Sequence, residues 1–171
     1  DYLSTGFGQA SSITVLQLCQ AYTAIFNDGT MVRPYVIDSI VDSDTGKVEK
    51  KYKKKAVGTP ITSTTAKEVQ ELMSHVTDDG ASGARFNLLM KTGTGQIYNT
   101  DLGKYDSDYH TSSIMAAAPA NDPKIMVYYG LVSPNITSYS AEPFKKIVRD
   151  TLQTCGISTT PTNDTQESYE A

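Results

Sequence analysis

The sequence has no long apolar run, few cysteines and histidines, and no excess of positive charge. No apolar stretch reaches the roughly 18 residues that a membrane-spanning helix needs. The net charge of −4 at pH 7 gives no reason to expect nucleic acid as a partner. No signal peptide is recognised at the N-terminus, which begins "DYLSTGFGQ" without a Met. We therefore expect a fragment of a longer protein that works on something other than nucleic acid.

Metal and cofactor chemistry is also not expected. The two cysteines, Cys19 and Cys155, are far apart in sequence, and neither belongs to a Cys-x-x-Cys or Cys/His cluster. We predict two buried, small apolar side chains, while the sequence leaves a disulfide open. The two histidines, His75 and His110, stand in no serine–carboxylate pattern, so no catalytic role is assigned to them.

What is present is typical of a soluble globular chain: 39% hydrophobic and 20% charged residues over 171 positions. This length is sufficient for one domain with a core of its own. We predict that the domain covers residues 1–157 and that the polar residues 158–171 form a disordered tail.

Apolar residues recur at helical spacing in three segments: 13–28, 62–79 and 141–155. Ser11 or Ser12 is expected to cap the first helix, and Gly29 is expected to end it. Thr62 or Ser63 is the expected cap of the second helix, whose apolar face includes Leu72. The glycine-rich segment 4–12, "STGFGQASS", is predicted to be a loop.

Residues 35–53, "YVIDSIVDSDTGKVEKKYK", predict a β-hairpin that turns at "DSDTG". Its second arm is strongly basic and includes Lys47, Lys50, Lys51, Lys53, Lys54 and Lys55. These lysines fit an exposed edge strand that is protected against edge pairing. They equally fit contact with an anionic envelope polymer or a lipid surface.

Three further strands are predicted: 88–97, 111–120 and 124–133. The last two are joined through "ANDPK" and are expected to be antiparallel neighbours. Segments 80–87 and 98–110 are predicted to be loops. The elements together predict an α+β fold, in which helices cover an antiparallel sheet.

The most informative stretch is "LLMKTGTGQIYN", residues 88–99. Lys91 offers a cation that attracts a carboxylate and lowers the pKa of nearby hydroxyls. Thr92 and Thr94 should project to one face of a strand, and Gly93 and Gly95 to the other, where they permit close approach. The backbone N–H of Thr94 can serve as an oxyanion donor. These groups suit a ligand with a carboxylate beside a carbonyl under attack.

Lys-Thr-Gly is one of three motifs in the serine acyltransferases that react with penicillin. Two other stretches accompany it in order: "TGFGQASSITVLQLCQAYTAIFNDGTMVRPYVI" before it and "ANDPKIMVYYGLV" with a final helix after it. Over roughly residues 3–155 the chain resembles the C-terminal half of the transpeptidase domain of a class B penicillin-binding protein. The resemblance implies the penicillin-recognising sandwich fold, incomplete in this chain.

The resemblance also implies an activity. Such enzymes cross-link peptidoglycan stem peptides ending in D-Ala-D-Ala through a serine acyl-enzyme, and β-lactams acylate them. In that scheme Lys91 and Thr94 are catalytic, and the Thr94 N–H supplies half of the oxyanion hole. The residues implied to bind the substrate follow one another: Thr92, Gly93, Thr94, Gly95 and Gln96. Gly95 stands where the family more often has Ala.

The motif of the nucleophile, Ser-x-x-Lys, is absent, since no serine is followed by Lys three positions later. Thr64–Lys67 imitates it with Thr in place of Ser, inside a predicted helix. Ser133-Pro134-Asn135 imitates the second motif, Ser-x-Asn, but follows the Lys-Thr-Gly strand and is predicted to be a turn. We expect both motifs to lie upstream, so that this chain is not acylated without the N-terminal part of the same protein.

The implied location is the outer face of the bacterial cytoplasmic membrane, where an N-terminal helix absent from this chain would anchor the protein. Division or elongation proteins are possible partners. The acidic, tyrosine-rich segment 98–110 either lines the acceptor side of the cleft or is a solvated loop. Alternatives that share the fold are a β-lactam sensor, a non-catalytic binding module, a D,D-carboxypeptidase and a β-lactamase.

Overall fold

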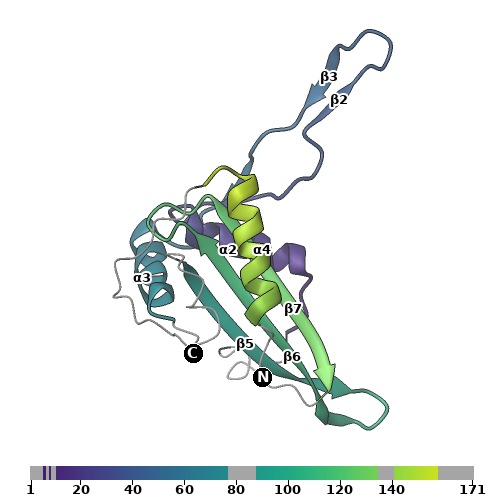
Figure 1. The fold of residues 1–171 in the computed structure, drawn as a ribbon, viewed down its shortest axis with the longest axis vertical. Helices are drawn as coiled ribbons and strands as arrows, with labels where there is room; N and C mark the ends of the chain where they lie inside the picture. Colours follow the sequence, from purple (N-terminus) through teal and green to yellow (C-terminus); the bar gives the residue numbers. More distant parts are fainter. Residues whose placement is uncertain (1–5, 7, 9–10, 77–87, 135–140, 158–171) are drawn as a thin grey trace, which may run out of the picture. The chain divides into compact units, whose positions relative to one another are not determined.

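A computed structural model describes residues 6, 8, 11–76, 88–134 and 141–157. The chain divides into two compact units, Asp1–Glu71 and Leu72–Ala171 (Figure 1). The predicted loop 80–87 and tail 158–171 lie outside the described residues. Of the predicted loop 4–12, Gly6 is helical and Gly8 is in a turn. Within the described ranges, no helix has the length and apolarity needed to cross a membrane.

The first unit combines helices with two short strand pairs. Its elements are α2 (Val15–Phe26), β1 (Met31–Val32), β2 (Ser39–Val41), β3 (Val48–Lys51), β4 (Ala56–Gly58) and most of α3 (Ser63–Ser74). Both pairs, β1–β4 and β2–β3, are antiparallel. Both helices and the β2–β3 hairpin were predicted, but α3 ends at Ser74, five residues before the predicted end at 79. β1 and β4 are too short for periodicity to indicate them.

Helix α2 is capped by Thr14, so the prediction of Ser11 or Ser12 is wrong. The Thr14 hydroxyl accepts a hydrogen bond from the Gln17 N–H at 3.2 Å, and the Gln17 side chain accepts one from the Thr14 N–H at 2.9 Å. This reciprocal capping box needs Gln or Glu three residues after the cap. Among the three hydroxyl residues at the start of the helix, Thr14 alone has one there.

Replacing Thr14 with alanine is expected to lower the free energy of unfolding by about 1 kcal/mol, because an N–H of the first turn loses its acceptor. Ser12→Ala is the matched control and should change stability by less than about 0.5 kcal/mol, since Ser12 is exposed and precedes the cap. Urea denaturation followed by circular dichroism measures both. Equal losses in the two variants would contradict the assignment of Thr14 as the cap.

Helix α2 ends at Phe26, as the following glycine predicted. Asp28 and Gly29 take positive φ values of 50° and 86°, and the Gly29 N–H donates to the Ala24 carbonyl at 2.8 Å. That bond is the six-residue closure of a Schellman motif, which satisfies a carbonyl of the last turn.

Helix α3 begins after Thr62, as predicted, and the Thr62 hydroxyl accepts a hydrogen bond from the Thr65 N–H at 3.1 Å. Gln70 links α3 to the end of α2 by donating to the Ile25 carbonyl at 2.5 Å. Met73 is buried, but Leu72 is 70% exposed, so its assignment to the buried face is wrong. A helical apolar stripe can be wider than the face that a neighbouring element covers.

The second unit is a three-stranded antiparallel sheet with one helix against it. Its elements are β5 (Leu89–Asn99), β6 (Lys104–Ala118), β7 (Ile125–Pro134) and α4 (Ala141–Thr154). The order β5–β6–β7 places β5 at one edge. The predicted strands, their antiparallel connection and the final helix are confirmed.

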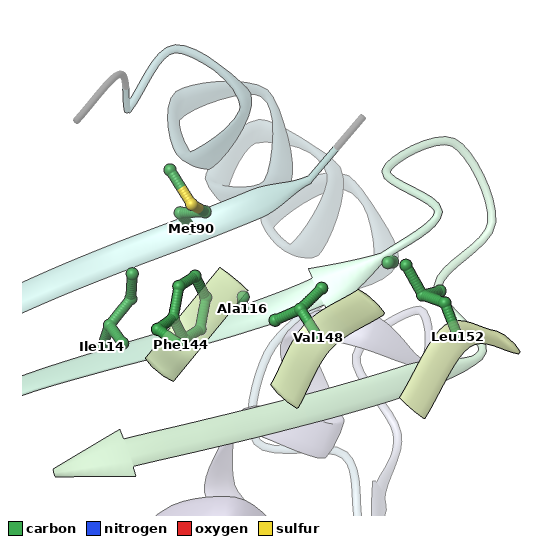
Figure 2. Close-up of a cluster of buried hydrophobic side chains, with 7 residues drawn as sticks. Met90, Ile114, Ala116, Phe144, Val148 and Leu152 are labelled. Carbon is green, nitrogen blue, oxygen red and sulfur yellow. The ribbon is translucent and has the colours of Figure 1, made fainter. Parts of the chain in front are cut away.

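The core of the second unit lies between α4 and one face of the sheet (Figure 2). On α4, Phe144, Val148 and Leu152 repeat at four-residue spacing and are all buried. They pack against sheet residues that share a face by register: Met90, Ile114, Ala116 and Ala118. This packing fixes which face of β5 is turned toward α4 and which is turned away.

Segment 98–110 is not a loop, contrary to the sequence prediction. β5 and β6 extend through it as a hairpin, and Tyr98 and Tyr105 pair across the strands with their rings edge to face at 5.4 Å. The Asn99 side chain accepts the N–H of Asp101 at 3.0 Å and thereby forms the turn. The segment is polar because both faces of this two-stranded extension meet solvent, which removes the alternation that identifies a strand.

The prediction that both cysteines are buried is wrong. Cys19 is half-buried and Cys155 is exposed, and both thiols are free. Partial burial raises the pKa of the Cys19 thiol. Cys155 follows Thr154, the last residue of α4, and its side chain is exposed.

Candidate active site

The Lys-Thr-Gly-Thr motif lies near the start of β5, just past the buried residues Leu89 and Met90. β5 is an edge strand of the sheet, and β6 is its partner within the described residues. An edge strand presents backbone donors and acceptors along one side. A ligand in extended conformation can therefore pair with the motif's backbone and reach side chains on both faces.

The register places the motif's cation and hydroxyls on opposite faces of the sheet. Lys91 pairs with Met115, whereas Thr92 pairs with Ile114, which faces α4. Thr94 lies on the same face as Thr92 because side chains alternate along a strand. The predicted separation of the threonines from the glycines is thus confirmed, and the lysine lies on the glycine face.

The Lys91 side chain is exposed, and its ammonium donates a hydrogen bond to the backbone carbonyl of Thr92. Through this contact the side chain lies along its own strand, toward the following residue. The ammonium therefore remains beside the motif, where it can act as a localised cation for an anionic ligand.

The two hydroxyl residues differ in depth. Thr92 is half-buried, and Thr94 is exposed. Across from Thr94 lies Ser112, which is 2% exposed and whose hydroxyl has no hydrogen-bond partner among the described residues. Sequence reasoning did not single out Ser112, although a serine at a core-facing position of an apolar strand is an available signal.

The next residue pair on the same face of β5 and β6 is also polar. Gln96 pairs with His110, whose Nδ1 is buried and has no hydrogen-bond partner in the part of the chain described. The pKa of Asp106 is held below its usual value chiefly by the hydrogen bond from the Asp108 N–H. A smaller electrostatic contribution from His110 lowers the same pKa. The predicted binding residue Gln96 is itself exposed.

The glycines of the motif face different surroundings. A Cβ on Gly93 would lie 3.1 Å from the Ser113 hydroxyl, while one on Gly95 would meet nothing within 4 Å. A Cβ at 93 would therefore be in tight contact with Ser113, whereas space does not limit position 95. Both positions keep their side of the strand free of side chains beside Lys91.

The imitations of the other motifs lie elsewhere. Thr64–Lys67 is inside α3, as predicted, and the Thr65 hydroxyl is bonded to that of Thr62 at 2.9 Å. Ser133 and Pro134 end β7, so the predicted turn does not include them, and Asn135 lies outside the described residues. No three His, Cys, Asp or Glu side chains gather into a metal-binding group in the ranges that the structure covers.

A comparison with protein families decides among the folds that could carry this strand. Residues 1–153 match the family model described as the penicillin binding protein transpeptidase domain. The chain belongs to this family. The match covers both units, including α2 and the motif-bearing sheet.

Relatives of known sequence agree with this assignment. The chain is 30% identical over 161 residues to stage V sporulation protein D of Bacillus subtilis, with 90% of the chain and 25% of the relative aligned. It is also 30% identical over 164 residues to the probable peptidoglycan D,D-transpeptidase PenA of Neisseria gonorrhoeae, covering 90% of the chain and 26% of the relative. The chain therefore spans about a quarter of the length of these relatives.

Solved structures share the fold. Penicillin-binding protein 2X from Streptococcus thermophilus superposes with a TM-score of 0.74 at 27% identity, over 89% of this chain and 24% of that one. Penicillin-binding protein 3 from Mycobacterium tuberculosis, solved with ampicillin, gives a TM-score of 0.76 at 24% identity, over 92% and 38%. The predicted α+β fold, the penicillin-recognising sandwich in incomplete form, is confirmed.

Proposed function

We propose that this chain is the C-terminal part of a peptidoglycan D,D-transpeptidase and supplies one wall of its active site. The observation that carries the proposal is the Lys91–Thr94 motif at the edge of the family's sheet. The proposed substrate is a stem peptide ending in D-Ala-D-Ala, and β-lactams are proposed to acylate the same site. The PenA relatives are described as probable peptidoglycan D,D-transpeptidases, which supports the reaction class.

Lys91 is proposed to stabilise the ionised form of the nucleophile and to favour the substrate carboxylate. Its exposed position beside the strand edge supports this role, because a ligand along β5 would pass the ammonium. Enclosure by the remainder of the domain would lower the local dielectric and strengthen both attractions.

Thr92 and Thr94 are proposed to donate their hydroxyl hydrogens to the carboxylate that ends the substrate. The Thr94 N–H is proposed as one donor of the oxyanion hole, which stabilises charge on the attacked carbonyl. Gly93, Gly95 and Gln96 would border the bound peptide.

The nucleophile is proposed to lie upstream of Asp1. No serine here is followed by Lys three positions later, and the chain spans about a quarter of its relatives. The acyl-enzyme would form on that upstream serine, and an amine of a second stem peptide would then resolve it. The outer face of the bacterial cytoplasmic membrane is proposed as the location, because the resemblance to class B penicillin-binding proteins implies it.

Acylation by benzylpenicillin, followed by intact mass, tests the proposal. The chain alone should gain no mass, and the chain joined to its upstream region should gain one penicilloyl group. Lys91→Ala should slow that acylation about 100-fold, which corresponds to about 2.7 kcal/mol of transition-state stabilisation. Lys104→Ala is the matched control, because Lys104 is exposed on the same β5–β6 hairpin and should leave the rate unchanged.

Two outcomes would contradict parts of the proposal. An adduct on the chain alone would place the nucleophile within residues 1–171. Equal acylation rates for the Lys91 and Lys104 variants would contradict the proposed role of Lys91 in the reaction.

A further inference from the structure

The β2–β3 hairpin concentrates positive charge in a protein that is otherwise acidic. Its second arm, residues 47–55, contains six lysines and one glutamate, a net charge of +5. With the three aspartates of the first arm and turn, residues 35–55 have a net charge of +2, whereas the whole chain carries −4. β2 and β3 pair with each other and with no other strand in the described residues, and together they extend as a two-stranded arm (Figure 1). We call residues 35–55 the basic hairpin.

Exposed apolar residues lie on the same hairpin as these lysines. Two backbone hydrogen bonds join the arms at the base of the hairpin, from the Arg33 N–H to the Lys55 carbonyl at 2.9 Å and from the Tyr52 N–H to the Asp38 carbonyl at 2.8 Å. Between these bonds, Val36 is 100% exposed and Ile37 is 54% exposed. Lys53 and Lys54 lie between the same bonds on the opposite arm.

The same mixture continues toward the turn. Ile40 is exposed and pairs across the strands with Lys50, and the neighbouring Val41 and Val48 are exposed too. The Lys50 ammonium lies 4.7 Å from the centre of the Tyr52 ring. From its base to residues 41 and 48, therefore, the basic hairpin offers lysines together with exposed or partly exposed aliphatic side chains.

We propose that the basic hairpin docks on an anionic lipid bilayer. Clustered lysines are attracted to anionic headgroups, and adjacent aliphatic side chains can enter the boundary between headgroups and acyl chains. A polyanion with phosphate groups alone would satisfy the lysines but would leave the exposed Val36 and Ile37 in water. Because the two arms of one hairpin together carry both features, the bilayer is favoured.

The hairpin would lie along the surface rather than insert by its tip. The turn carries Asp42 and Asp44, and Asp42 accepts hydrogen bonds from the backbone N–H groups of Asp44 and Thr45 at 3.0 and 2.7 Å. These carboxylates would be repelled by anionic headgroups. Docking would also hold in place a two-stranded ribbon, which is marginally stable in water by itself. This inference does not depend on the proposed transpeptidase activity.

The test is co-sedimentation of the 171-residue chain with vesicles of phosphatidylglycerol and phosphatidylcholine, compared with phosphatidylcholine alone. We expect binding to the anionic vesicles that weakens as salt is raised. One variant replaces four exposed lysines of the hairpin with glutamine: Lys47, Lys50, Lys51 and Lys53. Since each lysine near such a surface contributes about fivefold in partitioning, this variant should bind at least about 100-fold more weakly.

A matched variant changes net charge by the same amount elsewhere. It replaces four other exposed lysines with glutamine: Lys67, Lys104, Lys124 and Lys146. It should bind within about threefold of the unchanged chain, since its charges lie outside the proposed surface. Val36→Ser with Ile37→Ser keeps every lysine and should also weaken binding, because the aliphatic contact with lipid is lost.

Three results would overturn the proposal: equal binding by the two lysine variants, equal binding to both vesicle types, or binding to soluble polyphosphate without binding to vesicles. The last would assign the lysines to an anionic polymer. Circular dichroism of each variant verifies that the fold is kept.

Discussion

Replacing Phe144 with alanine is expected to lower the free energy of unfolding by about 4 kcal/mol. Phe144 is fully buried at the centre of the cluster between α4 and the sheet (Figure 2). Removing the ring loses the favourable free energy of transferring it from water to the core, and it leaves a cavity beside Met90 and Ile114. The strands can relax into this cavity only partly. A loss of this size is a large share of the 5–15 kcal/mol that holds a typical domain folded.

Ile147→Ala is the control for the Phe144 variant. Ile147 lies on the same helix but is 41% exposed, so its truncation should cost about 1 kcal/mol or less. Both substitutions raise helix propensity, so a difference between them reports packing. Urea unfolding measured by circular dichroism suits this chain, which has no tryptophan. Similar losses in both variants would contradict the placement of Phe144 in the core.

Gly29→Ala is expected to cost about 3 kcal/mol, the second-largest effect. A Cβ at this position would lie 2.3 Å from the carbonyl oxygen of Ile61, so the backbone of one segment must shift. Gly29 also has a φ of +86°, a left-handed conformation that costs an L-residue roughly 1–2 kcal/mol. Both penalties act at the point where the end of α2 meets the start of α3.

Gly46→Ala separates the two contributions to the Gly29 effect. Gly46 has a φ of +69° at the hairpin turn, and a Cβ there would meet nothing within 4 Å. This control should show the conformational cost alone, about 1–2 kcal/mol. Amide hydrogen exchange in α2, together with the unfolding curve, measures the difference. An effect at Gly29 no larger than that at Gly46 would contradict the close contact with Ile61.

Local patterns in the sequence were sufficient for the long elements and the motif. Helical spacing predicted α2, α3 and α4, and alternation with turn residues predicted the basic hairpin and the core of β5, β6 and β7. The Lys91–Thr94 motif was assigned to a strand because it follows an apolar stretch, and its alternating faces followed from strand geometry. The family could be recognised from short stretches in a fixed order, which the family model confirms.

The errors arose where a local pattern was absent or shared. Segment 98–110 has no apolar face, so hydrophobic periodicity does not mark the two strands that Tyr98 and Tyr105 join across the hairpin. Ser11, Ser12 and Thr14 all have hydroxyls, and the prediction did not use Gln17, which lies three residues after Thr14 and completes its capping box. Leu72 belongs to the apolar stripe of α3 and is nevertheless exposed. The spacing of apolar residues on a helix does not show how much of that stripe a neighbouring element covers.

Residue types and their spacing along the chain specify local geometry: which segments are helical or extended, and which side chains share a face. Strand order, register and packing bring together residues that are distant in sequence. The structure therefore supplied the position of β5 at the sheet edge, the buried Ser112 opposite Thr94, and the contact that restricts position 29 to glycine. No local pattern contains these pairings, because each depends on a backbone segment that arrives from elsewhere in the chain.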